Sequence, residues 1–322
     1  MFLYPESIVN EEVHTETLKK LSESPLIDAL DCWVWRTPER SREEIAILKA
    51  CGKVINYNVG DRFGEDPSFP ASESAAERER AYSLYMREIS AGLTIGTKKI
   101  VIGSGPDIPS SHDAAKERFF EFILRLLNNI PSDVSLVLEP TDWDIDKHFL
   151  FGPLDETVDF IKRVRAEGYE NFGLLLDQCH VPIIYETLES ALRKGACVLN
   201  HIHLGNAVLK DTASKYYGDK HPAWNYPGSE YTDDDGIKFI KLLKDIGYTD
   251  REKATVTFEM RPYEGVSSEE SLERFVIPAS PTVSIPPTLN ERSISNVFAP
   301  SLAEAIAAHT PAVPPPHTTT SY

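Results

Sequence analysis

The 322-residue sequence lacks the features of several protein classes. No apolar run approaches the roughly 18 residues that span a bilayer, which argues against a membrane partner. The first residues carry neither a basic region nor a long apolar stretch, so we expect no signal peptide. No glycine-rich nucleotide loop follows the first strand-like run, which disfavours an open, doubly wound sheet.

Cysteine and positive charge are both scarce. The four cysteines show no spacing typical of a metal site, and we expect reduced thiols in a reducing compartment, the cytoplasm. Lysine and arginine number 33 against 50 acidic residues, which gives a formal net charge of −17. Such a charge repels phosphate backbones, so we expect no nucleic-acid partner, although a local basic patch is compatible with an acidic protein.

Strand-like and helix-like segments alternate almost to residue 277. Eight short apolar runs have the composition of buried parallel strands: residues 2–4, 26–31, 54–57, 99–103, 135–139, 172–177, 199–203 and 254–259. Amphipathic segments such as 155–167 and 233–246 lie between them and are followed by Gly168 and Gly247, as helices often are. Eight strand–helix units in a chain of this length predict an α/β fold, a single-domain (β/α)8 TIM barrel.

The C-terminal part of the chain has a different composition. Proline, serine and threonine are frequent in residues 278–322. We therefore divide the chain into a barrel, 1–277, and a Pro/Ser/Thr-rich extension, 278–322. The extension is either a flexible tail or an arm that docks on a partner subunit.

Four residues with metal-binding side chains end four successive strand-like runs: Glu139, Asp177, His203 and Glu259. The carboxyl ends of barrel strands meet at one face, so the four side chains should converge. Three carboxylates there would repel one another without a cation. An oxygen-rich set with one imidazole suits Mn²⁺, with Mg²⁺ and Co²⁺ as alternatives.

The predicted metal site implies a class of chemistry. Open coordination positions can hold two oxygens of a hydroxy-ketone, which makes the carbon next to its carbonyl more acidic and stabilises an enediolate. Glu139 and Glu259 would take and return the proton from two sides of the substrate. We therefore predict a metal-dependent enzyme acting on a carbohydrate.

Two further histidines lie near these ligands. His180 follows Asp177 by three residues and is either a substrate or second-layer hydrogen-bonding group or a loop histidine bound to backbone. We expect His201 to be structural, with a side chain that points away from that of His203.

A loop and several tryptophans offer other substrate contacts. Asp219 and His221 are candidates for further ligands or a substrate lid, and a plain surface loop is the alternative. Trp33 and Trp143 lie near predicted strand ends, where an aromatic face would suit a sugar ring or a flat aglycone. Buried core is the alternative for both.

The chain resembles the xylose-isomerase-like TIM barrels over residues 1–277. The matching elements are Glu139, Asp177 with His180, the run His-Leu-Gly-Asn that starts at His203, and Glu259. By that resemblance Glu139, Asp177, His203 and Glu259 bind the metal, Glu139 and Glu259 form the acid–base pair, and His180 contacts substrate.

Four stretches look like the catalytic subunit of C-glycoside deglycosylating enzymes: 139–147, 171–177, 201–206 and 217–222. The resemblance implies a lyase that breaks the anomeric carbon–carbon bond of a 3-oxo-glycoside, with a smaller partner subunit; a homo-oligomer is the alternative. Lys147, in the first stretch, joins the expected substrate contacts.

Other branches of the same superfamily fit less well. Ketose epimerases usually carry an arginine a few residues beyond the metal histidine, where this chain has Asn206-Ala-Val-Leu-Lys. The endonuclease IV type needs histidines after earlier strands, and His112 falls too late. The alternatives are an isomerase or epimerase of a keto sugar or sugar phosphate, then a phosphodiesterase of the endonuclease IV type, or a non-catalytic sugar-binding barrel.

Overall fold

A parallel sheet of seven strands forms the centre of the protein. The computed structural model describes residues 2–59 and 68–279. Each strand pairs with the next in sequence order, and every pair is parallel. The strands are β1 (Ala29–Cys32), β2 (Val54–Asn58), β3 (Lys99–Gly103), β4 (Ser135–Glu139), β5 (Phe172–Asp177), β6 (Leu199–Leu204) and β7 (Val256–Phe258).

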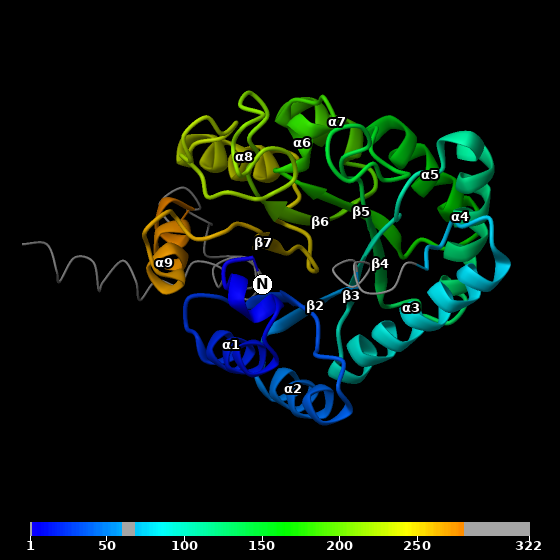
Figure 1. The fold of residues 1–322 in the computed structure, drawn as a ribbon, viewed down its shortest axis with the longest axis horizontal. Coiled ribbons are helices and arrows are strands. Elements are labelled where there is room, and N and C mark those ends of the chain that lie inside the picture. Colours follow the sequence, from blue (N-terminus) through cyan, green and yellow to red (C-terminus); the bar gives the residue numbers. More distant parts are fainter. Residues whose placement is uncertain (1, 60–67, 280–322) are drawn as a thin grey trace, which may run out of the picture.

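Helices surround the strands, as Figure 1 shows. The α-helices are α1 (Glu11–Glu23), α2 (Pro38–Ala50), α3 (Ala75–Ile95), α4 (His112–Leu127), α5 (Leu154–Ala166), α6 (His180–Ile183), α7 (Leu188–Gly195), α8 (Asp233–Asp245) and α9 (Ser268–Ala279). Two 3₁₀ helices, η1 (Pro5–Ile8) and η3 (Pro109–Ser111), precede α1 and α4. This alternation confirms the predicted fold class, a TIM barrel.

The barrel is nearly closed. Backbone ladders run from β1 to β7, and side chains bridge the seam between the two end strands. The Oγ1 hydroxyl of Thr257 on β7 donates to Oδ1 of Asp31 on β1 at 2.9 Å. Asp31 therefore ties the first strand of the barrel to the last.

The strand predicted at residues 2–4 is wrong. This segment is a turn that leads into η1, whose first residue is Pro5. The carbonyl of Tyr4 accepts from both the N–H and the hydroxyl of Ser7, so it is used within the turn. Pro5 has no N–H to give to a ladder, which favours the helical start over a strand.

The two helices predicted in detail are confirmed. In α5, Val158, Ile161 and Val164 are buried on one face, and Gly168 follows with φ 99°. In α8, the Thr232 side chain and the third helical residue, Asp235, form a reciprocal capping box, which satisfies amide groups at the helix start. Glycine at the left-handed positions after such helices avoids a steric cost.

The side chains inside the barrel fall into an apolar group and a polar group. On β3, β4 and β5, Val101, Val137 and Leu175 form a small buried cluster of their own. They share a face with the strand-end acids Glu139 and Asp177, because residues two apart on a strand point the same way. Polar side chains on β1, β2, β6 and β7 form the other group and lead towards the candidate site.

The structure also bears on the cysteines, on membrane-spanning helices and on the C-terminal extension. The four cysteines are free thiols, of which Cys32 and Cys179 are buried and Cys197 is exposed. Among the described residues, no helix is both long and apolar enough to cross a bilayer. Helix α9 passes the predicted boundary at residue 277 and ends at Ala279; residues 280–322 lie outside the described part, so the role of the extension stays a prediction.

Candidate metal centre

The four predicted ligands meet at the carboxyl ends of their strands. One ligand atom from each of Glu139, Asp177, His203 and Glu259 lies within 4.8 Å of the others; we call this set the Glu139 cluster. Asp177 and His203 are direct partners in the β5–β6 ladder, which sets them at the same height. Glu259 follows β7 and extends its pairing, because its N–H donates to the carbonyl of Leu204 at 2.8 Å.

One ring nitrogen of His203 faces all three carboxylates. Nδ1 lies 2.5 Å from Oε2 of Glu259, 3.5 Å from Oδ2 of Asp177 and 3.7 Å from Oε1 of Glu139. Nε2 lies on the other side of the ring, 2.7 Å from Oδ2 of Asp31. The cluster therefore presents one nitrogen and several oxygens to a common point.

The donor atoms suit a divalent cation. Oε1 of Glu139 and Oδ2 of Asp177 are buried and have no hydrogen-bond partner among the described residues. Buried carboxylate oxygens without partners carry a large desolvation cost, which a cation would offset. Oxygens with one imidazole match the preferences of Mn²⁺ or Mg²⁺ better than those of structural zinc, which takes thiolates or more imidazoles.

The electrostatics of the metal-free cluster point the same way. Burial raises the pKa of Asp177. Burial opposes protonation of His203, but the negative charge of Glu259 and hydrogen bonds to the surrounding carboxylates raise its pKa well above the ordinary value. A proton on His203 therefore stands in for part of the positive charge that the cluster needs.

A second cluster adjoins the first. Asp219 Oδ1 lies 2.7 Å from Nε2 of His221 and 3.2 Å from Nε2 of His180, and Cys179 lies beside them; we call these four residues the Asp219 cluster. The other oxygen of Asp219 pairs with the ammonium of Lys147. The structure thus brings together Lys147, His180, Asp219 and His221, which the sequence had offered as separate candidates.

Backbone carbonyls connect the two clusters. His180 Nδ1 donates to the carbonyl of Pro140 at 3.1 Å, one residue after Glu139. His221 Nδ1 donates to the carbonyl of Glu259 at 2.8 Å. His221 has a left-handed backbone, with φ 53°, a conformation that costs free energy outside glycine. The histidines of the second cluster therefore hold the strand ends that carry two acids of the first.

Charge pairing fixes the protonation of the Asp219 cluster. Burial would raise the pKa of Asp219, but the charges of Lys147 and His180 hold it well below its usual range. Burial would lower the pKa of His180, but the charges of Asp219 and Asp177 raise it to about 9. The two N–H groups of the protonated ring are both used, one on the carbonyl of Pro140 and one on Asp219.

A carboxylate that the sequence did not reveal shapes the loop after β4. Asp142 is buried and accepts hydrogen bonds from four successive backbone N–H groups, those of residues 144–147. This tight turn brings Lys147 back over the barrel to Asp219. Aspartate favours turns of this kind, so the residue type is the one local signal that the sequence gives for it.

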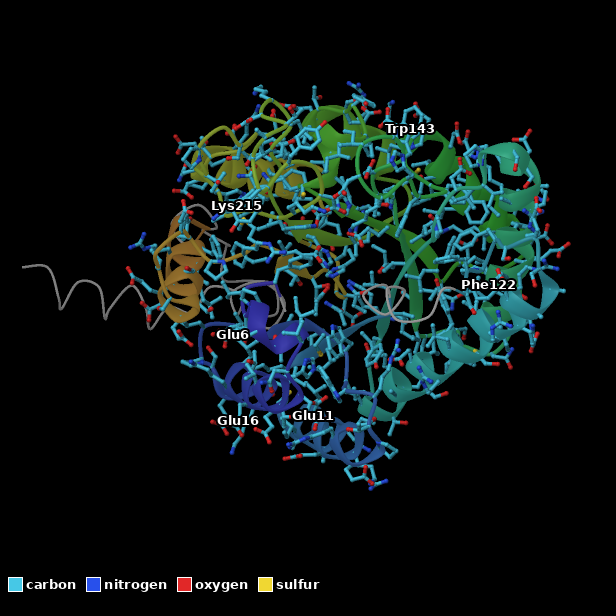
Figure 2. All side chains as sticks on the ribbon, in the orientation of Figure 1. Glu6, Glu11, Glu16, Phe122, Trp143 and Lys215 are labelled. Atoms are coloured by element: carbon cyan, nitrogen blue, oxygen red, sulfur yellow. The ribbon has the colours of Figure 1, made fainter. Side chains whose placement is uncertain are left out.

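Of the two candidate tryptophans, one is exposed and one is not. Trp143 is 41% exposed, packs over Gly152 and meets the ring of Tyr185 edge-on, and Figure 2 shows it towards the rim. Trp33 is 2% exposed, with its ring 4.0 Å from that of His14. Trp33 therefore belongs to the core, and of the two tryptophans only Trp143 offers an exposed face to a substrate.

The expected direction of the His201 side chain is wrong, whereas a structural role stays a prediction. Residues two apart on a strand share a face, so His201 and His203 both point into the barrel, with ring centroids 4.9 Å apart. Both donate to Asp31 Oδ2. Asp31 was missed as a site residue, although it lies at the end of a predicted strand, as the four predicted ligands do. Phe2, also missed, stacks on His221 at 4.6 Å.

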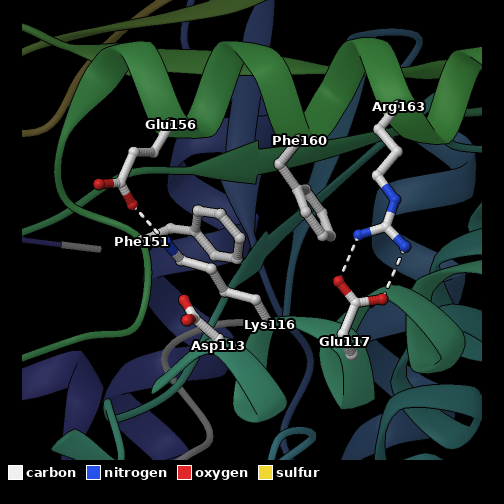
Figure 3. A pocket seen from close by; sticks show the side chains of 7 residues that line it. All are labelled: Asp113, Lys116, Glu117, Phe151, Glu156, Phe160 and Arg163. Atoms are coloured by element: carbon white, nitrogen blue, oxygen red, sulfur yellow. Dashed lines mark hydrogen bonds and ion pairs between the residues drawn. The ribbon is translucent and has the colours of Figure 1, made fainter.

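A separate pocket lies on the outside of the barrel. It occupies about 270 Å³ between α4 and α5, as Figure 3 shows. Arg163 makes two hydrogen bonds of 2.6 Å with Glu117, and Lys116 pairs with Glu156. These four charges satisfy one another, and the pocket contains none of the predicted site residues, so it is not part of the candidate site.

Comparison with known proteins agrees with the fold. The family model described as the xylose isomerase-like TIM barrel matches residues 54–275. A search of curated proteins by sequence gave no match.

Solved structures of several enzymes share the architecture. An AP endonuclease of family 2 from Brucella melitensis has a TM-score of 0.60 at 18% identity, covering 82% of this chain and 92% of its own. The 3-keto-D-glucoside 4-epimerase of E. coli gives 0.54 at 15%, covering 74% and 84%. The D-psicose 3-epimerase of Clostridium cellulolyticum H10 gives 0.57 at 18%, covering 84% and 91%. At these identities the likeness concerns the fold.

Proposed function

Because the chain belongs to the xylose isomerase-like TIM barrel family, we propose that it is a divalent-metal-dependent enzyme that isomerises or epimerises a keto sugar. The proposed reaction begins with removal of a proton from the carbon next to the carbonyl. The Glu139 cluster is the observation that carries this proposal, because it gathers three carboxylates and one imidazole at the carboxyl ends of the barrel strands.

The cluster divides into two kinds of ligand. The side chains of Asp177 and His203 are 0% and 1% exposed, whereas those of Glu139 and Glu259 are 13% and 15% exposed. The two glutamates thus keep one side towards the open end of the barrel. We assign Asp177 and His203 to metal binding alone, and Glu139 and Glu259 to metal binding and proton transfer.

A divalent cation held there, Mn²⁺ in our proposal, would polarise the substrate carbonyl and make the neighbouring C–H more acidic. One glutamate then takes the proton, and the other returns a proton to the opposite face or to the neighbouring carbon. The two N–H groups of His180 donate to the carbonyl of Pro140 and to Asp219, and Nδ1 lies 3.5 Å from Glu139 Oε1, so His180 acts on that glutamate through its charge.

The surroundings fit a sugar better than a nucleic acid. Lys147 is 38% exposed, and Trp143 offers an aromatic face, so a polyhydroxylated ring finds both a cation and a flat apolar surface. The Asp219 carboxylate is already paired with Lys147, which disfavours the several metals of an endonuclease IV type of site. The net charge of −17 adds to this, because it repels phosphate backbones.

A second candidate is cleavage of a C-glycoside that carries a 3-oxo group. Ketose epimerases are expected to have an arginine a few residues beyond the metal histidine, and the stretch from Asn206 onwards has none. The side-chain amide of Asn206 donates to the carbonyls of Ala223 and Tyr231 and to Ser229. One structural neighbour acts on a 3-keto-D-glucoside. In this reaction the same proton is lost, a double bond forms to the anomeric carbon, and the aglycone takes the electron pair of the broken bond and a proton. A smaller partner subunit belongs to this candidate.

Hydrogen exchange with solvent tests the proposal. Protein reconstituted with Mn²⁺ is incubated in D₂O with ketoses and, separately, with 3-oxo-O- and 3-oxo-C-glycosides, and products are identified by mass spectrometry and NMR. We expect deuterium at the carbon next to the carbonyl. Ketose isomers support the main proposal, and a free aglycone from the C-glycoside supports the second candidate.

Two variants make the result specific. Glu139→Gln keeps the shape of the side chain but removes the base, and should lower exchange by about 100-fold or more. Glu264→Gln is the control, because Glu264 is exposed and pairs with the exposed Lys215, and neither residue belongs to the Glu139 or the Asp219 cluster. A protein that binds these sugars without any exchange, in either form, would be a sugar-binding barrel, and the proposed activity would be wrong.

A further inference from the structure

Asp31, next to the Glu139 cluster, accepts four side-chain hydrogen bonds. Its Oδ1 accepts from Asn56 Nδ2 at 2.6 Å and from Thr257 Oγ1 at 2.9 Å. Its Oδ2 accepts from Nε2 of His201 at 2.6 Å and of His203 at 2.7 Å. An ionised carboxylate only accepts hydrogen bonds, so both histidines must present an N–H to it.

A series of hydrogen bonds leads from Lys99 through Thr255 and His201 to Asp31. Lys99 Nζ has three acceptors, the carbonyls of Asn200 and Lys253 and the hydroxyl of Thr255 at 2.6 Å, which match the three donors of an ammonium group. The Thr255 oxygen accepts from Lys99, so its own hydrogen is free for Nδ1 of His201, 2.8 Å away. His201 then carries its hydrogen on Nε2, as its bond to Asp31 requires.

This series of bonds ends on an acceptor-only group, the carboxylate of Asp31. Lys99, Thr255, His201 and Asp31 lie along the barrel interior, from the start of β3 to the end of β1. The carbonyl of Thr255 also lies 3.2 Å from Nδ1 of His201, but the hydrogen on Nε2 is fixed by the carboxylate of Asp31. These hydrogen bonds hold Oδ2 of Asp31 in a fixed position beside Nε2 of His203.

We propose that Asp31 is a positioning residue that holds His203 with Nε2–H towards Asp31 and Nδ1 towards the three acids of the Glu139 cluster. Metal-binding histidines commonly donate their second N–H to a carboxylate, which fixes the ring and raises the basicity of the ligand nitrogen. The inference rests on the proposed function for the identity of the ligand, but the orientation of the ring stands on the geometry above.

Asp31→Asn is the variant that tests this role, with Thr257→Val as the matched control. The first removes the charge that faces His203, whereas the second removes a bond to the other oxygen of the same carboxylate and leaves Oδ2 untouched. Isothermal titration with Mn²⁺ should show a dissociation constant about 10- to 100-fold higher for Asp31→Asn, the usual effect of losing such a partner. Thr257→Val should stay within about threefold of wild type, since it keeps that partner.

A spectroscopic readout separates positioning from simple loss of stability. In ¹⁵N-labelled protein with diamagnetic Zn²⁺, we expect His203 to show a slowly exchanging proton on Nε2 and a metal shift on Nδ1, with assignment through His203→Gln. The Nε2–H signal should exchange fast in Asp31→Asn and persist in Thr257→Val. Folding of each variant is checked by circular dichroism.

Two results would overturn the inference: a folded Asp31→Asn protein that binds Mn²⁺ like wild type, or a metal-loaded wild type in which His203 carries its proton on Nδ1. Absence of Mn²⁺ binding in wild type contradicts the proposed function instead. In that case the Nε2–H signal of the metal-free protein still decides whether Asp31 holds the ring, because His203 then donates through the same nitrogen.

Discussion

Asp177 and His203 are direct partners across the β5–β6 ladder, and Oδ2 of Asp177 lies 3.5 Å from Nδ1 of His203. The distance between these two side chains is therefore set by backbone pairing and not by loop conformation. Sites built on strands hold their geometry more closely than sites on loops. Glu139 and Glu259, on or next to β4 and β7, complete the cluster from either side.

Metal affinity should depend on pH through His203. Its pKa is raised in the metal-free protein, and a metal must displace that proton from Nδ1. The proton stabilises the metal-free fold at low pH, and this stabilisation is lost as the pH rises through the raised pKa. At pH values below that pKa, we therefore expect the dissociation constant for Mn²⁺ to fall by about tenfold for each unit by which the pH rises.

Titration calorimetry at pH 6, 7 and 8 in buffers of different ionisation enthalpy measures both the affinity and the number of protons released. About one proton should leave per ion bound. Affinity that stays flat over this range, with no proton release, would contradict the assignment of His203 as a ligand.

Gly205 should be required for the cluster. A Cβ atom there would lie 2.7 Å from Oδ1 of Asp177 and 2.7 Å from the Cβ of Cys179, so alanine must push the ligand strand or its loop aside. Such overpacking costs about 1–3 kcal/mol, and we expect Gly205→Ala to weaken Mn²⁺ binding by about 5- to 150-fold.

Gly247→Ala provides a control for the loss of a glycine. Gly247 has φ 69° after α8, with open space where a Cβ would lie, so alanine strains the backbone without touching the cluster. It should lower the melting temperature and leave the affinity for Mn²⁺ unchanged. If Gly205→Ala binds the ion as well as Gly247→Ala does, the close packing of Gly205 against Asp177 has no part in metal binding.

Trp143 should bind substrate without taking part in the chemistry. Its indole packs over Gly152 and is 41% exposed, which suits a preformed face for a ring. Trp143→Ala should raise KM by about 2- to 10-fold, the range of single aromatic contacts. It should leave kcat nearly unchanged, because such a contact stabilises the bound substrate and the transition state equally.

Steady-state kinetics with the substrate found by deuterium exchange measure both constants. Tyr185→Phe serves for comparison, since it removes only the hydroxyl that donates to Asp144 and keeps the ring beside Trp143. A fall in kcat with an unchanged KM in Trp143→Ala would place the indole at the reacting atoms and contradict this role.

The fold and the cluster were predictable because both follow from strands. Apolar runs that end in Glu139, Asp177 and His203 are visible in the sequence, and parallel strands bring their carboxyl ends together. The predicted strand at residues 2–4 failed because Pro5 starts a 3₁₀ helix, and three residues are too few for the pattern to decide. Register explains the error at His201, whose position two residues before His203 already places it inside the barrel.

The second cluster could not be assembled from the sequence. Lys147 and Asp219 lie 72 positions apart on two irregular loops, and the turn around Asp142 that joins them depends on backbone hydrogen bonds without any periodic pattern. Asp31 could have been predicted as a site residue, because it ends a predicted strand as the other acids do. Its role became visible only through the hydrogen bonds that cross the seam between β1 and β7.

Metal content per chain is the most direct test of the central claim, that Glu139, Asp177, His203 and Glu259 bind one divalent cation. Inductively coupled plasma mass spectrometry would compare wild type with His203→Ala after Mn²⁺ is supplied and excess ion removed, with Glu264→Gln as a surface control. We predict one manganese ion in wild type and in the control, and none in His203→Ala. A wild type that retains no ion, or a His203→Ala variant that retains it fully, would contradict the account.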